Sequence, residues 1–142
     1  MLTYAAERLI ARMHGLTDDE WNWAPIPGDT EVTICWRLDH ITETLAEGLN
    51  WVWLGQDLAS ALALGPATSA DEAVAALRSS VSLVDLTRRD SVDLSAAMGD
   101  VAGPFADSTG RALVLHVADE LIHHAAEAAL IRDLHAARSV ID

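Results

Sequence analysis

Residues 113–131 read LVLHVADELIHHAAEAALI, a stretch that combines the apolar spacing of a core-facing helix with three histidines and three carboxylates. At about 100° per residue, the polar side chains that lie within about 60° of Glu120 form one stripe. This stripe consists of His116, Glu120, His123, His124 and Glu127. Leu113 and Ile131 fall on the same stripe, so its two ends are apolar. A solvated helix face would not be bracketed in this way, and we predict that the stripe lies partly inside the fold.

Two interpretations of this stripe are open. In the first, the residues are surface charges or isolated core histidines that each have a hydrogen-bond partner. In the second, they form a site that holds a cation. Burying several ionised groups without compensation costs on the order of several kcal/mol each, a sum comparable to the stability of a whole domain. Glu120 and His124 are four residues apart and project from successive turns, which is the spacing of helical metal ligands. We therefore favour a cation site.

The composition limits the classes of function. The chain has 142 residues, and we expect one domain over residues 1–142. Its net charge is −13, with no lysine and nine scattered arginines, so nucleic acid and anionic membranes are unsuitable partners. The only cysteine, Cys35, excludes an internal disulfide and a thiolate cage for zinc. The first residues, MLTYAAERLI, lack the pattern of a secretory signal, and we expect a cytoplasmic protein.

Helix signals recur along the chain and strand patterns are almost absent. A first helix is predicted from residue 2 to a stop at Gly15, and Thr17 with Glu20 has the spacing of a capping box. Ser69 and Glu72 form a second such box. Further helices are predicted over about 34–54, from the second box through residue 89, and over about 111–138. The expected fold is all-α, an antiparallel four-helix bundle.

The helix predicted over 34–54 has two different sides. One side is aliphatic, and the other carries a histidine, two tryptophans and two further polar residues: Trp36, His40, Thr44, Glu47 and Trp51. Such a division places one side in the core and the other beside a cleft. A third metal ligand has to come from outside the last helix. The candidates are His14, His40 and His135, of which His40 lies well inside a helix.

The sequences WRLDHITE at 36–43 and ELIHHAAEAALIRDL at 120–134 resemble the DinB-like (YfiT-like) metal-binding four-helix bundles. Members of that family usually carry one histidine on the second helix and a histidine pair, four apart, on the fourth. Here Glu120 replaces the first histidine of the pair, which is similar to the His, Glu, His set of the mycothiol-dependent maleylpyruvate isomerase branch. The resemblance implies that His40, Glu120 and His124 bind one divalent metal ion. It also implies a thiol cofactor, mycothiol or another small thiol.

Two imidazoles and one carboxylate leave a coordination position open, which is typical of catalytic sites. We expect zinc or nickel, although iron and manganese accept the same ligands. Glu127 and Glu47 are candidates for outer-sphere acceptors or a proton carrier, with Glu127 the catalytic candidate. Trp36 and Thr44 are the candidates for cofactor binding, and His123 is expected to stay outside the coordination sphere.

Together with the open coordination position, the resemblance implies a thiol-dependent transferase or isomerase that acts on a small electrophilic substrate, with a homodimer as a possible assembly. Two alternatives stay open. One is metal-dependent hydrolysis at the same site, and the other is an acidic helical binding module without catalysis.

Overall fold

The computed structural model describes residues 2–46, 48–54, 65–87 and 93–141. Within these ranges the chain forms six α-helices and one 3-10 segment and contains no strand, which confirms the all-α class. Four helices are long: α1 (Leu2–Arg12), α3 (Ile34–Ala46), α5 (Ala70–Thr87) and α6 (Gly110–Ile141). The short elements are α2 (Asp18–Asn22), α4 (Gly48–Trp53) and η1 (Asp100–Phe105). No helix in the described ranges is both long and apolar enough to cross a membrane.

The helix boundaries follow local signals in the sequence. Helix α1 ends shortly before Gly15, which adopts a positive φ of 67° that side chains with a Cβ avoid. The capping box at α2 is confirmed: the Thr17 hydroxyl accepts from the Glu20 amide, and the Glu20 carboxylate accepts from the Thr17 amide.

The second predicted box is divided between two residues. The Ser69 hydroxyl accepts from the Glu72 amide at 3.2 Å, whereas the Glu72 carboxylate accepts from the Thr68 amide at 2.9 Å. The helix predicted over 34–54 is present as α3 and α4, with Glu47 between them outside the described residues. The last predicted helix extends slightly further at both ends, as the 32 residues of α6, or about 48 Å.

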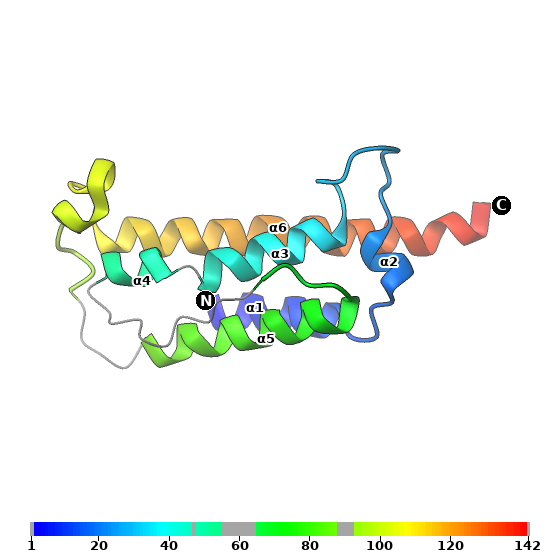
Figure 1. Ribbon diagram of the computed structural model, residues 1–142, viewed down its shortest axis with the longest axis horizontal. Helices are drawn as coiled ribbons and strands as arrows, with labels where there is room; N and C mark the ends of the chain where they lie inside the picture. Colours follow the sequence, from blue (N-terminus) through cyan, green and yellow to red (C-terminus); the bar gives the residue numbers. More distant parts are fainter. Residues whose placement is uncertain (1, 47, 55–64, 88–92, 142) are drawn as a thin grey trace.

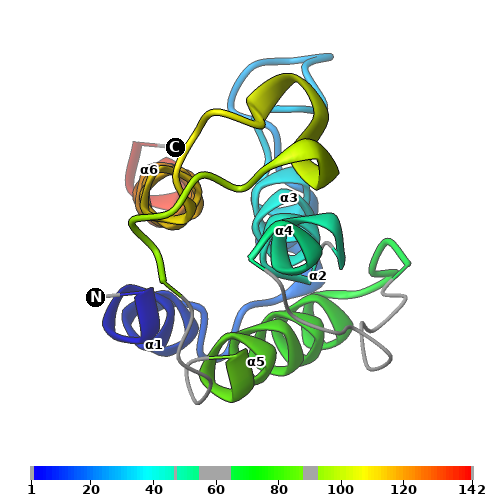
Figure 2. The ribbon, with the colours of Figure 1, turned by 90° about the vertical axis from the view of Figure 1, so that its left-hand side faces the viewer.

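The four long helices form a ring in which α3 packs between α5 and α6, and α1 packs between α6 and α5 (Figure 1, Figure 2). Their directions differ from the predicted antiparallel order. Figure 1 shows α1 and α6 running one way and α3 and α5 the other. Two of the four neighbouring pairs, α1 with α6 and α3 with α5, are therefore parallel.

Side-chain pairs agree with these directions. Arg12, at the end of α1, pairs with Asp133 in the last third of α6. The Asp39 carboxylate on α3 accepts from the amide of Ala67, just before α5 begins. Short connections force successive helices to be antiparallel, but 15 residues separate Leu54 from Ala70. Such a segment reaches up to about 50 Å when extended, enough to return along the bundle before α5 starts.

The core lies inside this ring of helices. Buried side chains come from every long helix, and the largest of the fully buried ones are Met13, just beyond the end of α1, and Ile34, Leu38, Ile41, Leu45, Leu77 and Leu121. Helix α3 contributes four of these seven side chains, the largest share. The opposite side of α3 is not covered by α5, and it faces the polar stripe of α6. This placement creates the candidate site.

Candidate metal centre

The polar stripe of α6 divides into a buried flank and an exposed flank. His124 is 8% exposed and belongs to the core of the protein. Glu120 and Glu127 are half-buried, whereas His116 and His123 are exposed. The side of the stripe that faces α3 is therefore the buried side, and this decides which residues can share one site.

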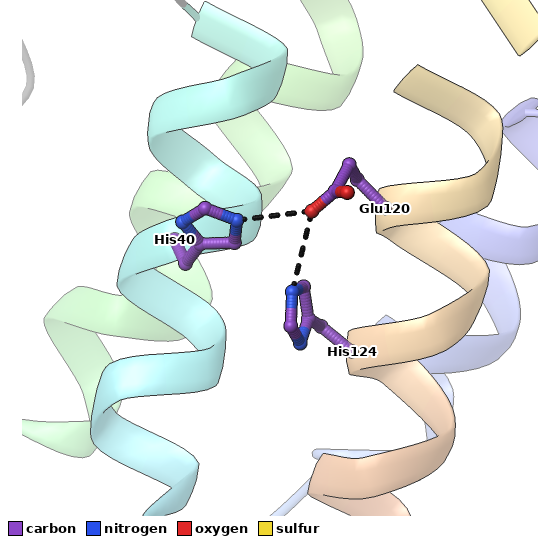
Figure 3. Close-up of side chains that lie close together, drawn as sticks. All are labelled: His40, Glu120 and His124. Atoms are coloured by element: carbon purple, nitrogen blue, oxygen red, sulfur yellow. Dashed lines mark hydrogen bonds and ion pairs between the residues drawn. The ribbon is translucent and has the colours of Figure 1, made fainter. Parts of the chain in front are cut away.

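His40, Glu120 and His124 come together across the α3–α6 interface (Figure 3). The Nε2 atom of His40 lies 3.1 Å from Glu120 Oε2, and Nε2 of His124 lies 3.3 Å from the same oxygen. Their three ligand atoms lie within 4.8 Å of one another. His14 and His135, the other candidates for a third ligand, take no part in this cluster, and His135 pairs with Asp19 near the far end of α6.

The donor set fits a divalent transition-metal ion. Metal bonds of about 2.0–2.2 Å at tetrahedral angles separate neighbouring ligand atoms by about 3.3 Å, which is close to both distances from Glu120. Counted for the side chains alone, His124 is 10% exposed, Glu120 25% and His40 33%, so the fold encloses much of all three. Two nitrogens and one oxygen suit zinc, nickel, iron or manganese. The residues thus fit the predicted ion.

Glu127 orients His124 from its other side. Its Oε2 atom accepts a hydrogen bond from Nδ1–H of His124 at 2.7 Å, which leaves the lone pair of Nε2 for a ligand bond in the neutral ring. The Arg37 guanidinium forms an ion pair with the same oxygen at 2.8 Å. Arg37 lies on α3, one turn before His40. A cation already occupies this side of Glu127, which favours an orienting role over a second metal position.

His123 lies outside the three-residue cluster. It is 57% exposed, its Nε2 donates to Glu127 at 3.1 Å, and its ring stacks on His124 at 4.6 Å between centroids. His123, His124 and Glu127 do form a second group with metal-ligand spacing. That group shares His124 and includes the carboxylate that Arg37 neutralises, so we keep the prediction that His123 is not a ligand.

Trp36 supports the histidines from α3. Its indole stacks on the His40 ring with centroids 4.8 Å apart and meets His124 edge-on at 5.6 Å. The Arg37 guanidinium lies 4.6 Å from the centroid of the same indole. Trp36 thus fixes both rings, which is compatible with its predicted role beside a cofactor.

Other predicted cleft residues have less defined roles. Thr44 lies one turn beyond His40 and is half-buried, and its carbonyl accepts from Asn50 at 3.0 Å. Its predicted part in cofactor binding stays a prediction. Glu47 and the side chain of Trp51 lie outside the described part of the chain.

Both carboxylates at the site are held in the ionised form. The hydrogen bond from His40 is the main cause of the lowered pKa of Glu120, and the charges of His116 and His124 add to it against the effect of burial. For Glu127, burial alone would raise the pKa, but the hydrogen bond from His124 and the charge of Arg37 outweigh it and lower the pKa. Ionised carboxylates are the form that binds a cation and accepts from an imidazole N–H.

Cys35 is poorly suited to act as a nucleophile. The side chain is half-buried against the core, and its Sγ lies 4.0 Å from the Asp39 carboxylate. Burial, and then the negative charge of Asp39, raise the pKa of the thiol. The thiolate is therefore disfavoured near neutral pH.

The family model of the DinB superfamily matches residues 1–128. The chain belongs to the DinB superfamily. The match covers α1 through most of α6 and contains His40, Glu120, His124 and Glu127. The comparisons with curated proteins and with solved structures give no match. Membership in the superfamily confirms the DinB-like resemblance found in the sequence, whereas the likeness to the mycothiol-dependent isomerase branch stays a prediction.

Proposed function

We propose that this DinB superfamily protein is a divalent-metal-dependent enzyme that transfers a small thiol to an electrophilic substrate or isomerises that substrate through thiol addition. His40, Glu120 and His124 hold the ion. The observation that carries the proposal is that two imidazole Nε2 atoms from different helices face one ionised carboxylate oxygen at 3.1 and 3.3 Å.

The ligand count supports catalysis over a structural role. Structural zinc is normally enclosed by four protein ligands, whereas this cluster supplies three and is partly open to solvent. When bound at such a site, a divalent ion acts as a Lewis acid that makes a water or thiol nucleophilic near neutral pH.

The surrounding residues would keep the three ligands in place. Glu127 holds His124 with Nε2 directed at Glu120, and Arg37 holds Glu127. Trp36 restrains the His40 ring by stacking. Glu127 also contacts the exposed His123, and this pair offers a path by which a proton could pass between the site and solvent. Preorganisation of this kind lowers the cost of reaching a reactive geometry.

The choice of thiol chemistry comes from the ligand pattern. The His, Glu, His order of His40, Glu120 and His124 is similar to that of the mycothiol-dependent maleylpyruvate isomerase branch. Cys35 offers no competing nucleophile, because burial and Asp39 raise the pKa of its thiol. A thiol would therefore come from a small cofactor.

The test is an assay of a panel of electrophilic substrates with zinc- or nickel-loaded protein, with and without mycothiol and other small thiols. We expect turnover to require both metal and thiol and to fall at least about a hundredfold in His124→Ala. His116→Ala is the matched control, because His116 is exposed on the same helix. Metal-dependent turnover that is indifferent to every thiol would replace this proposal with hydrolysis. Turnover without metal would contradict it.

A further inference from the structure

A small pocket adjoins the candidate metal centre on the outer side of α3. Its volume is about 290 Å³, and it is lined by Thr30, Cys35, Trp36, Asp39, His40 and Glu43. His40 belongs both to this pocket and to the metal cluster. A molecule held here would therefore lie beside the proposed ion. The volume is at the lower end of ligand pockets and suits a small molecule.

The wall of the pocket has a marked charge. Asp39 and Glu43 are four residues apart on α3 and are both part of the lining. Like charges at this spacing destabilise a helix when nothing compensates them. No lysine or arginine is among the lining residues, and the nearest arginine in sequence, Arg37, is paired with Glu127 and lies over the Trp36 indole.

The partners of the two carboxylates are neutral. Asp39 accepts from the amide of Ala67 at 3.4 Å and lies 4.0 Å from the Cys35 thiol. Glu43 is exposed, and none of the ion pairs among the described residues includes it. The rest of the chain adds to the negative potential, since its net charge is −13. A cation in the pocket would compensate both groups.

We infer that this pocket binds the ammonium group of a small amine-bearing substrate, with Asp39 and Glu43 beside the charge and Cys35 and Trp36 beside the apolar part. Carboxylate substrates such as maleylpyruvate are disfavoured here, because they would lie against two acidic side chains. This inference deepens the proposed function and rests on it only for the claim that the bound amine is a substrate.

The test measures amine binding without the metal. Benzylamine, benzyl alcohol and benzoate have similar shapes and differ in charge, and each is titrated into chelator-treated protein. The readout is the NMR signal of the Trp36 indole N–H, assigned with Trp36→Phe. We expect benzylamine to shift this signal at lower concentration than either analogue. Its affinity should also fall as the salt concentration rises.

A double variant tests the assigned carboxylates. In Asp39→Asn/Glu43→Gln, benzylamine affinity should fall about tenfold, because both negative charges are removed. The first substitution keeps a side-chain oxygen that still accepts from the Ala67 amide. The control, Glu7→Gln/Asp119→Asn, removes two exposed charges away from the pocket and should change affinity less than about twofold.

Three results would overturn the inference: benzyl alcohol or benzoate binding as well as benzylamine, an unchanged affinity in the double variant, or no probe shifting the Trp36 signal. Zinc binding is measured separately on the same protein. Protein that binds the amine but no zinc would contradict only the proposed function, and protein that binds zinc but not the amine would contradict only this inference.

Discussion

Replacing Glu127 by Gln tests whether this carboxylate acts through His124. The substitution keeps the shape of the side chain but removes the charge that accepts from His124 Nδ1 at 2.7 Å and pairs with Arg37 at 2.8 Å. Gln keeps only a neutral and weaker acceptor, and mutation of the partner of a metal-ligating histidine typically costs about 10- to 100-fold in metal affinity, or about 1.4–2.8 kcal/mol. We expect a loss in this range, because the charged carboxylate orients the ring of a ligand whose side chain is only 10% exposed.

The assay is a competitive zinc titration of Glu127→Gln against a chromogenic chelator. Asp119→Asn is the control, since it removes one charge from the same helix at an exposed position. Arg37 is 13% exposed and loses its ion-pair partner in the variant. The double variant Arg37→Gln/Glu127→Gln removes this unpaired cation, so any loss of zinc affinity that remains comes from the lost orientation of His124. If Glu127→Gln bound zinc within about twofold of the parent, the orienting role would be refuted.

Three further predictions concern neighbouring residues. His123→Ala should keep full metal occupancy, because His123 is 57% exposed and contacts His124 and Glu127 from outside the three-residue cluster; loss of the ion in elemental analysis would make it a ligand. Cys35→Ser should keep activity within about twofold, since the raised pKa of the thiol disfavours the nucleophilic form; loss of turnover in a folded variant would contradict this. Glu20→Gln should lower the free energy of unfolding by about 1.5–3 kcal/mol near neutral pH, because Glu20 accepts from Arg132 at 3.0 Å. Burial alone would raise the pKa of Glu20, but the contacts with Arg132 and Thr17 outweigh it and lower the pKa below the ordinary 4.5. The difference in the free energy of unfolding between parent and variant should therefore be complete above pH 4.5 and vanish as the pH falls further. Urea titrations at several pH values measure this difference.

The sequence predicted the elements well because their signals are local. The capping box at Thr17 and Glu20 and the stop at Gly15 depend on neighbours within a few residues, and both are present. The directions of the helices depend on a longer feature. The connection between Leu54 and Ala70 is long enough to return along the bundle. The pattern of apolar residues within the helices does not indicate whether it does, so the direction of α5 could not be predicted.

The candidate site was predictable to a different extent on each helix. The angles on α6 placed Glu120 and His124 on one stripe, but they could not distinguish the buried flank from the exposed flank. That distinction needs the position of α3, which leaves His116 and His123 in solvent. The ion pair between Arg37 and Glu127 was missed. Its only signal in the sequence is that Arg37 lies about 60° from His40 on the same helix, towards the side that faces α6.

The most direct test of the central claim is the metal content of the purified, zinc-reconstituted protein and of His40→Ala, measured by elemental analysis and calorimetry. His40 is the ligand that joins α3 to the α6 pair, and His116→Ala serves as the exposed histidine control. We predict about one ion per chain in the parent and in His116→Ala, and loss of that ion in His40→Ala. Full occupancy in His40→Ala, or no ion in the parent, would contradict the assignment of His40, Glu120 and His124 as a metal centre.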